Sequence, residues 1–338
     1  MPDPLPPSTR GEVPGAGTAF PGAGRQAGGV ENPLRTDDVL STTDRVPEAR
    51  EALPGSDKPR SLLSDAWYDL RRRPTFVISA LLIVFLLFVA AFPGVFTNLD
   101  PKFCELSNSR GGPTGGHPFG YDKQGCDVFA RTVYGARPSI LVGILVTLGC
   151  VLVGGTVGSM AGFYGGAADS VLSRVTDIFF AIPLLLGAIV FLQVFDQRNV
   201  STVVLALVVL GWTQIARITR GAVISVKEAD FVLAARALGA NDLRILVRHV
   251  LPNALAPVIV VATISLGIFI VTEATLSFLG IGLPPSTVSW GGDINSAQDS
   301  LRTTPRILLV PATALSVTVL AFILLGDAVR EALDPRLR

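Results

Sequence analysis

The sequence is poor in the residues that soluble enzymes use for chemistry and solvation. Only 16% of its 338 residues are charged, and only His117 and His249 are histidines. A soluble domain usually has about 25% charged residues, and catalytic triads and zinc sites commonly use histidine. The net charge of +1 offers no strongly basic face for nucleic acid. These shortages argue against a soluble enzyme, a histidine-based metal site and a nucleic-acid-binding protein.

Several chemical motifs are also missing. The sequence has no Gly-x-x-x-x-Gly-Lys-Ser/Thr string, so we expect the chain not to bind ATP itself. It has no Gly-x-Ser-x-Gly nucleophile elbow. Its start lacks the basic stretch followed by an apolar run that defines a secretory signal peptide. We expect no enzyme activity, no cofactor and no metal ion in this chain.

The N-terminal part differs in composition from the rest. Residues 1–60 include 18 prolines and glycines and almost no aromatic residues. Such a segment cannot bury enough apolar surface to offset its chain entropy. We predict a disordered cytoplasmic tail over 1–60, with a partner-binding tail as the alternative. A basic, amphipathic juxtamembrane segment is expected over 61–75 and a transmembrane domain over 76–338.

Long apolar runs dominate the remainder. A bilayer core about 30 Å thick needs about 20 apolar residues in a helix, and only helices satisfy their own backbone in hydrocarbon. The six candidate spans are 76–92, 140–161, 178–195, 201–216, 254–271 and 307–326. The short polar link 196–200 predicts a helical hairpin between the third and fourth spans. The expected fold is therefore an all-α polytopic membrane protein with six transmembrane helices.

Lysine and arginine near the span ends indicate the orientation. With the N-terminus in the cytoplasm, the inner side has 15 of these residues and the outer side has 8. Cytoplasmic loops are enriched in basic residues, so both termini are expected inside. This topology leaves one long cytoplasmic loop, 217–253, and two long outer loops. The glycine-rich second span is expected to allow close helix packing.

The cytoplasmic loop has the pattern of two short helices joined by a turn. Asp230 is expected to cap the first helix, and Gly239 is expected to end it in the left-handed conformation. Asn241 or Asp242 is expected to cap the second helix, whose end Pro252 should limit. The result would be a small helix–turn–helix between two membrane spans.

Apolar and basic residues on these two helices suggest what the element does. The predicted apolar face of the first helix is Phe231, Ala234, Ala235 and Leu238, and that of the second helix is Leu243, Leu246, Val247 and Val250. Three arginines are expected to face solvent: Arg236, Arg244 and Arg248. A DNA-binding helix–turn–helix is disfavoured, because the flanking spans hold it at the membrane. An interfacial helix lying on lipid is a second alternative. The favoured interpretation is insertion into a groove on a cytoplasmic partner.

The same residues resemble the EAA loop of the permeases of binding-protein-dependent ABC importers. The EAA loop has a Glu-Ala-Ala core, a glycine four residues later and an Ile/Val-Leu-Pro ending. This sequence matches the loop at Ala234, Ala235, Gly239 and 250–253, and it has Leu233 in place of the glutamate. Further segments are similar to the dipeptide/oligopeptide (peptide/nickel) permease family, as its second permease. They are 119–125, 127–131, 134–137, 273–282, 284–285, 289–291, 325–327 and 333–338.

The resemblance implies a concrete function and location. It implies the type I ABC importer permease fold, a homologous second permease subunit, two ATPase subunits that bind ATP and Mg, and an extracytoplasmic solute-binding protein. It implies residence in a bacterial inner (cytoplasmic) membrane and a passage for di- or oligopeptides. The residues expected to dock on the ATPase are Phe231, Ala234, Ala235, Arg236, Leu238, Gly239, Asn241 and Asp242.

The first outer loop has two of the three cysteines. Cys104 and Cys126 both lie on the side expected to be oxidising, and we hypothesise a disulfide between them, with two free thiols as the alternative. Cys150 lies in a span and is expected to be a small apolar residue. The loop between the paired cysteines is a candidate contact for the binding protein, with a plain connector as the alternative. Its named residues are Glu105, Asn108, Arg110 and His117.

Three other functions are compatible with parts of the sequence. A permease of the same kind could carry nickel or another small solute. A stand-alone secondary carrier commonly has buried charges in broken helices, whereas the expected spans contain almost no ionisable residues. A membrane enzyme would need a catalytic constellation that the sequence does not offer. Glu273 and Asp293 are candidates for the pathway or for interfacial exposure, and Trp290 is a candidate anchor at the membrane interface.

Overall fold

A computed structural model describes residues 70–195 and 198–333. The predicted tail 1–60, most of the segment 61–75 and the C-terminal stretch 334–338 lie outside the described residues. The described part is helical and contains no strand, only three isolated bridges in the loop before α3. Its elements are α2 (Pro74–Ala91), η1 (Pro93–Val95), η2 (Leu106–Asn108), α3 (Val128–Tyr164), α4 (Gly166–Phe180), α5 (Leu184–Leu192), α6 (Val200–Gly211), α7 (Thr213–Lys227), α8 (Asp230–Ala237), α9 (Asp242–Ile245), η3 (Leu246–Val250), α10 (Leu251–Phe278), α11 (Trp290–Ser296), η4 (Gln298–Ser300) and α12 (Arg306–Leu333).

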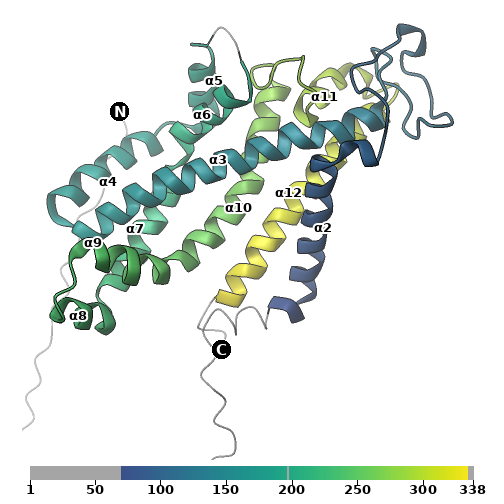
Figure 1. The fold of residues 1–338 in the computed structure, drawn as a ribbon. Helices are drawn as coiled ribbons and strands as arrows, with labels where there is room; N and C mark the ends of the chain where they lie inside the picture. Colours follow the sequence, from purple (N-terminus) through teal and green to yellow (C-terminus); the bar gives the residue numbers. More distant parts are fainter. Residues whose placement is uncertain (1–69, 196–197, 334–338) are drawn as a thin grey trace, which may run out of the picture. The chain divides into compact units, whose positions relative to one another are not determined.

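Within the described residues, four helices are long and apolar enough to cross a membrane, or up to six if each of two bent helix pairs counts as one span. The four are α2, α3, the continuous run Asp242–Phe278, and α12. The bent pairs are α4 with α5 and α6 with α7. Figure 1 shows α2 and α12 side by side, with the long α3 crossing them.

The helices extend beyond the apolar stretches that predicted the spans. α3 begins at Val128, well before residue 140, because the side chain of Asp127 accepts a hydrogen bond from the N–H of Ala130 at 2.6 Å. Its first turns have polar residues that bind other protein groups. Arg137, for example, donates from Nε to the carbonyl of Ala90 at 3.1 Å. A hydropathy pattern detects only the membrane-embedded part of such a helix.

Glycines in α3 allow α7 to pack directly against its backbone. A Cβ atom on Gly158 would lie 2.3 Å from the carbonyl oxygen of Ala216, and one on Gly154 would lie 2.5 Å from that of Trp212. These distances are too short for any side chain, so both positions require glycine. The expected close helix approach along the second span is confirmed.

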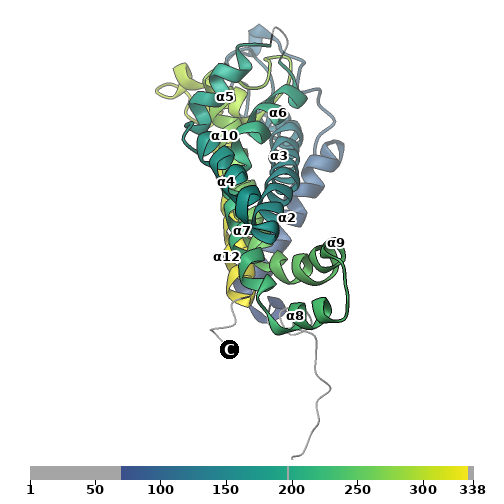
Figure 2. The ribbon, with the colours of Figure 1, turned by 90° about the vertical axis from the view of Figure 1, so that its left-hand side faces the viewer.

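Two spans are broken rather than straight. α4 and α5 meet at 80°, and α6 and α7 meet at 46°. The first break immediately precedes Pro183, and a residue before proline is disfavoured in helical conformation. The apolar stretch 178–195 therefore contains the end of α4 and all of α5, not one straight helix. Figure 2 shows α5 packed beside α6 at the end of the described unit opposite α8 and α9.

Candidate functional site

The helix pair α8–α9 has the turn chemistry that its sequence predicts, with two exceptions. Gly239 has φ of 82°, which confirms the left-handed turn. The side chain of Asn241 accepts from the N–H of Arg244 at 2.8 Å and caps α9. The cap prediction for Asp230 is wrong, because Asp230 is the first residue of α8 and Ala229 precedes it without a side-chain cap.

The prediction that Pro252 limits the second helix is also wrong. The chain runs as one continuous helix from Asp242 to Phe278. Proline lacks an N–H group and clashes with the carbonyl one turn before it. The wider π-turn Leu246–Val250 directly precedes it and accommodates the ring. Asn253 adds a hydrogen bond from Nδ2 to the carbonyl of His249 at 2.7 Å.

One side of the helix pair α8–α9 is buried against α3 and α7. Val232, Ile245 and Val250 are fully or almost fully buried, and they pack in one cluster with Phe163 of α3 and Val223 of α7. Each of these five apolar side chains loses nearly all its contact with solvent. Burial on this scale stabilises by about 1.5–3 kcal/mol for each side chain. The helix pair is therefore a rigid projection from α3 and α7.

The opposite side exposes apolar residues at the tip. Leu238 is 88% exposed, and Phe231 and Leu243 are also exposed. Ala234 is exposed, Ala235 is half-buried, and exposed Arg236 lies 3.8 Å from Asp242. The predicted apolar face of the second helix is divided, because Leu246 and Val250 are buried whereas Leu243 and Val247 are exposed. The exposed large apolar residues of α8, α9 and the residues that directly follow each helix are called the tip surface below: Phe231, Leu233, Leu238, Leu243 and Val247.

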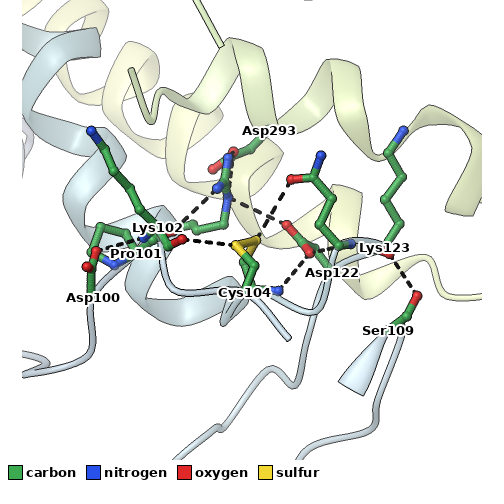
Figure 3. The surroundings of a disulfide bond; sticks show 11 residues. Asp100, Pro101, Lys102, Cys104, Ser109, Asp122, Lys123 and Asp293 are labelled. Atoms are coloured by element: carbon green, nitrogen blue, oxygen red, sulfur yellow. Dashed lines mark hydrogen bonds and ion pairs between the residues drawn. A yellow bond between two sulfur atoms is a disulfide. The ribbon is translucent and has the colours of Figure 1, made fainter. Parts of the chain in front are cut away.

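The loop before α3, which the sequence predicts to lie outside, is closed by a disulfide between Cys104 and Cys126 (Figure 3). The N–H of Glu105 donates to the carbonyl of Gly125 at 3.2 Å beside it. A Cβ atom on Gly125 would lie 1.8 Å from the carbonyl oxygen of Glu105, and its φ is +79°, so only glycine fits. Cys150 is free and buried, as expected. The hypothesised pairing is present in the structure.

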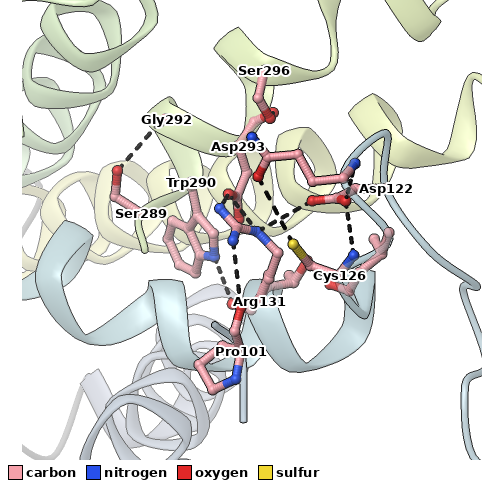
Figure 4. Close-up of polar contacts among 12 residues, drawn as sticks. Pro101, Asp122, Cys126, Arg131, Ser289, Trp290, Gly292, Asp293 and Ser296 are labelled. Atoms are coloured by element: carbon pink, nitrogen blue, oxygen red, sulfur yellow. Dashed lines mark hydrogen bonds and ion pairs between the residues drawn. The ribbon is translucent and has the colours of Figure 1, made fainter. Parts of the chain in front are cut away.

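A buried charge cluster fixes this loop to α3 and α11. Arg131 donates from Nε to Asp293 at 2.9 Å, and the same Nε lies 3.6 Å from Asp122. Asp122 also accepts from the N–H of Cys126 at 2.9 Å (Figure 4). Burial raises the pKa of Asp293 to about 6, although Arg131 opposes the rise. Of these three residues, only Asp293 is a named candidate from the sequence. Asp122 and Arg131 appear only as parts of the resembling segments 119–125 and 127–131.

The four loop residues named as candidate contacts do not form one cluster. Glu105 and Arg110 are exposed, whereas Asn108 and His117 are half-buried. His117 Nδ1 lies 2.8 Å from Asp127, and Asn108 donates to Glu105 at 3.2 Å. Arg110 has a positive φ of 58°, and its carbonyl accepts from Arg306 at 3.0 Å.

Two further expectations change with the structure. Trp290 is 1% exposed and donates from Nε1 to the carbonyl of Thr132 at 2.8 Å, so it packs against α3 and does not anchor at the membrane interface. Glu273 is fully buried and accepts from Ser277 at 2.7 Å, so interfacial exposure is wrong for it. Among residues 70–195 and 198–333, no group of three or more His, Cys, Asp or Glu side chains could hold a metal ion.

Comparison with known proteins identifies the family. A family model described as the inner membrane component of binding-protein-dependent transport systems matches residues 154–338. The chain belongs to this family. A second model, the N-terminal transmembrane domain of oligopeptide transport permease C, matches residues 61–110 of the permease. The permease is thus a multi-pass membrane subunit of an ABC importer and not an enzyme.

Individual relatives agree. The permease is 36% identical to the oligopeptide transport permease OppC of Bacillus subtilis, over 84% of this chain and 92% of that protein. It is 34% identical to the glutathione permease GsiD of Pectobacterium atrosepticum, over 80% and 90% of the two chains. A structure of the inward-facing MetNI methionine ABC transporter shares the fold, with a TM-score of 0.51 and 20% identity over 60% of this chain and 96% of that one.

Proposed function

We propose that this permease forms a passage for di- or oligopeptides together with a homologous second permease subunit. Two ATPase subunits that bind ATP and Mg would drive it, and an extracytoplasmic solute-binding protein would deliver the peptide. Relatives named as oligopeptide and dipeptide permeases, at 36% and 34% identity, support a peptide cargo. Nickel or another small solute is the alternative, and uptake assays with each cargo separate the two.

The proposed docking on an ATPase subunit rests on the exposed tip surface. Leu238 is 88% exposed on a helix pair whose other side is buried against α3 and α7. An exposed apolar patch on a rigid short helix suits insertion into a groove of a partner protein. We propose that Phe231, Leu238 and the turn at Gly239 dock in such a groove on an ATPase subunit.

The disulfide supports the proposed orientation in a bacterial inner membrane. Disulfides form and persist in oxidising compartments and are rare in the cytosol. The loop with Cys104 and Cys126 therefore belongs outside. The helix pair α8–α9 lies at the other end of the described unit (Figure 1), so in this orientation the tip surface would lie in the cytosol. This orientation agrees with the excess of basic residues on the proposed inner side.

A charge placed at the tip tests the docking. In reconstituted vesicles with all partner subunits, Leu238→Glu should abolish ATP-dependent peptide uptake, because a carboxylate would be buried without a partner in an apolar groove. Arg248→Glu is the matched control at the same end, since Arg248 is exposed and lies outside the tip surface. Full uptake by Leu238→Glu would refute docking through the tip surface.

A further inference from the structure

The two broken spans lie against each other at their breaks. The ring of Phe179, at the end of α4, lies 5.8 Å from the ring of Trp212, which separates α6 from α7. In hydrocarbon a break leaves backbone groups without partners, so breaks lie inside protein or beside a water-filled cavity. A cavity of about 240 Å³ lies at these breaks, lined in part by Pro183, Thr213 and Gln214.

An ion pair lies one turn from both breaks. Arg217 of α7 donates to Asp177 of α4 at 2.8 Å, and its guanidinium lies 3.8 Å above the ring of Phe180. The two side chains are 43% and 52% exposed. Both line a second cavity of about 420 Å³ between α3, α4 and α7. The ring of Phe180 thus covers one side of the Arg217 guanidinium, while the ion pair remains accessible from the second cavity.

This surface differs from a purely lipid-facing one, because it exposes the charged pair together with the apolar side chains Ile178, Phe180 and Ile218. The exposed large side chains of α2 are all apolar, among them Ile78, Leu81 and Val84. Arg217 and Asp177 lie just outside the predicted spans 201–216 and 178–195, but inside the two bent helix pairs that the structure offers as spans. Charged side chains within spans face the bundle interior or a water-filled cavity and mark substrate pathways. Exposed Gln214 lies one turn from Arg217 on α7, so amide and guanidinium lie on one side of the helix. The polar side of α7 therefore faces water or another subunit, not lipid.

A neighbouring ion pair between the same two helices has a structural role that the pair of Arg217 and Asp177 lacks. Arg220 donates to Asp169 through two bonds, at 2.5 and 2.7 Å. Such a two-bond arrangement holds α4 to α7 with defined geometry. The single bond between Arg217 and Asp177 is exposed and contributes little to stability, so it can open without loss of the fold.

We propose that Arg217 and Asp177 line the peptide passage and bind the charged ends of the cargo, the guanidinium taking the carboxylate and the aspartate taking the ammonium. This assignment rests on the proposed function for its cargo. A peptide with free termini carries both charges, and each needs a charged partner once it leaves bulk water. The exposed pair offers both partners at one place beside the broken helices.

Aqueous accessibility tests the passage without reference to the cargo. Gln214→Cys and Leu81→Cys place single thiols on α7 and on α2, where Leu81 is 65% exposed. The native cysteines do not interfere, because Cys104 and Cys126 are bridged and Cys150 is buried. In the assembled importer, a membrane-impermeant thiol reagent should modify Gln214→Cys and spare Leu81→Cys. An unreactive Gln214→Cys, or equal reaction at both positions, would overturn the passage assignment.

Substitution of the pair tests cargo contact. Arg217→Gln should reduce peptide uptake at least about tenfold, the usual effect of losing one charge-assisted hydrogen bond, while Arg217→Lys keeps the charge and most of the uptake. The thermal midpoint of the assembled complex should not change with Arg217→Gln but should fall with Arg220→Gln. Undiminished uptake by Arg217→Gln, or a fall in its thermal midpoint equal to that of Arg220→Gln, would overturn cargo contact. Should the wild-type importer carry no peptide at all, the proposed cargo fails, while the accessibility result still decides the passage.

Discussion

Replacing Gly239 by valine perturbs the turn between α8 and α9 and little else. Gly239 has φ of +82°, and no atom lies within 4 Å of the position that a Cβ would take. A substitution there meets no steric clash. Its only direct effect is to force an L side chain into the left-handed region.

The size of the effect follows from the backbone. A left-handed conformation costs a residue with a Cβ about 1–2 kcal/mol, and β-branched residues are the least tolerant. A cost of one or two kcal/mol changes a conformational ratio by a factor of about 5–30. Gly239→Asn should have a much smaller effect, because asparagine visits this region routinely.

The assay is the affinity of the isolated ATPase subunits for the permease pair in nanodiscs. Gly239→Val should weaken that affinity about 5–30-fold, with the factor set by the backbone cost, and Gly239→Asn should remain near wild type. Gly280→Val is the matched control, because Gly280 has φ of +76° and an equally open Cβ position in the turn after α10, where its carbonyl accepts from Arg198 of the link between α5 and α6 at 2.9 Å.

Two outcomes would refute the reasoning. An ATPase affinity of Gly239→Val equal to that of the wild type would show that the turn does not position the docking surface. An equal weakening by Gly239→Val and Gly280→Val would show a general effect of strain rather than a local one.

Three further predictions concern the outer end. Cys104→Ser should lower the free energy of unfolding by about 3 kcal/mol for a loop of this length, and a reductant should lower the thermal midpoint of the wild type but not of the variant. The pKa of Asp293 rises from 3.8 to about 6 on folding, so ionisation of this carboxyl group opposes the folded state. The contribution of Asp293 to stability therefore declines as pH rises through that interval and stays low above it. Asp293→Asn should remove this part of the pH dependence of the thermal midpoint, and an unchanged profile would contradict the assignment. Trp290→Phe keeps one aromatic ring but loses part of the buried indole and its hydrogen bond to the carbonyl of Thr132. It should lower the thermal midpoint by an amount equivalent to at least about 1 kcal/mol; an unaltered midpoint would contradict this.

Much of the fold could be predicted from local sequence, because hydropathy and turn chemistry act locally. α2 ends one residue before its predicted limit, and Gly239 and Asn241 have their predicted conformations and contacts. The break before Pro183 has a local signal in the proline itself, which hydropathy does not detect, whereas the break at Trp212 has no such signal. Hydropathy counts apolar residues and is insensitive to the direction of the chain, so a bent pair resembles one span.

Other features depend on residues far apart in the sequence. Arg131 and Asp293 are 162 positions apart, and no local pattern pairs them. The sequence predicts one apolar face for the second helix of the pair, but Leu246 is buried and Leu243 is exposed. Periodicity identifies apolar positions, whereas the tertiary contacts of α3 and α7 decide which of them are covered and which remain available to a partner.

The most direct test of the account is a cross-link from the tip surface. Leu238→Cys places a thiol at the most exposed large apolar position of the helix pair. In inside-out vesicles containing the whole importer, a short bifunctional thiol reagent should join this residue to an ATPase subunit, and an impermeant thiol reagent added outside intact cells should not reach it. Labelling of Leu238→Cys from outside intact cells, or a cross-link yield to the ATPase no higher than that of Leu81→Cys, would contradict the account.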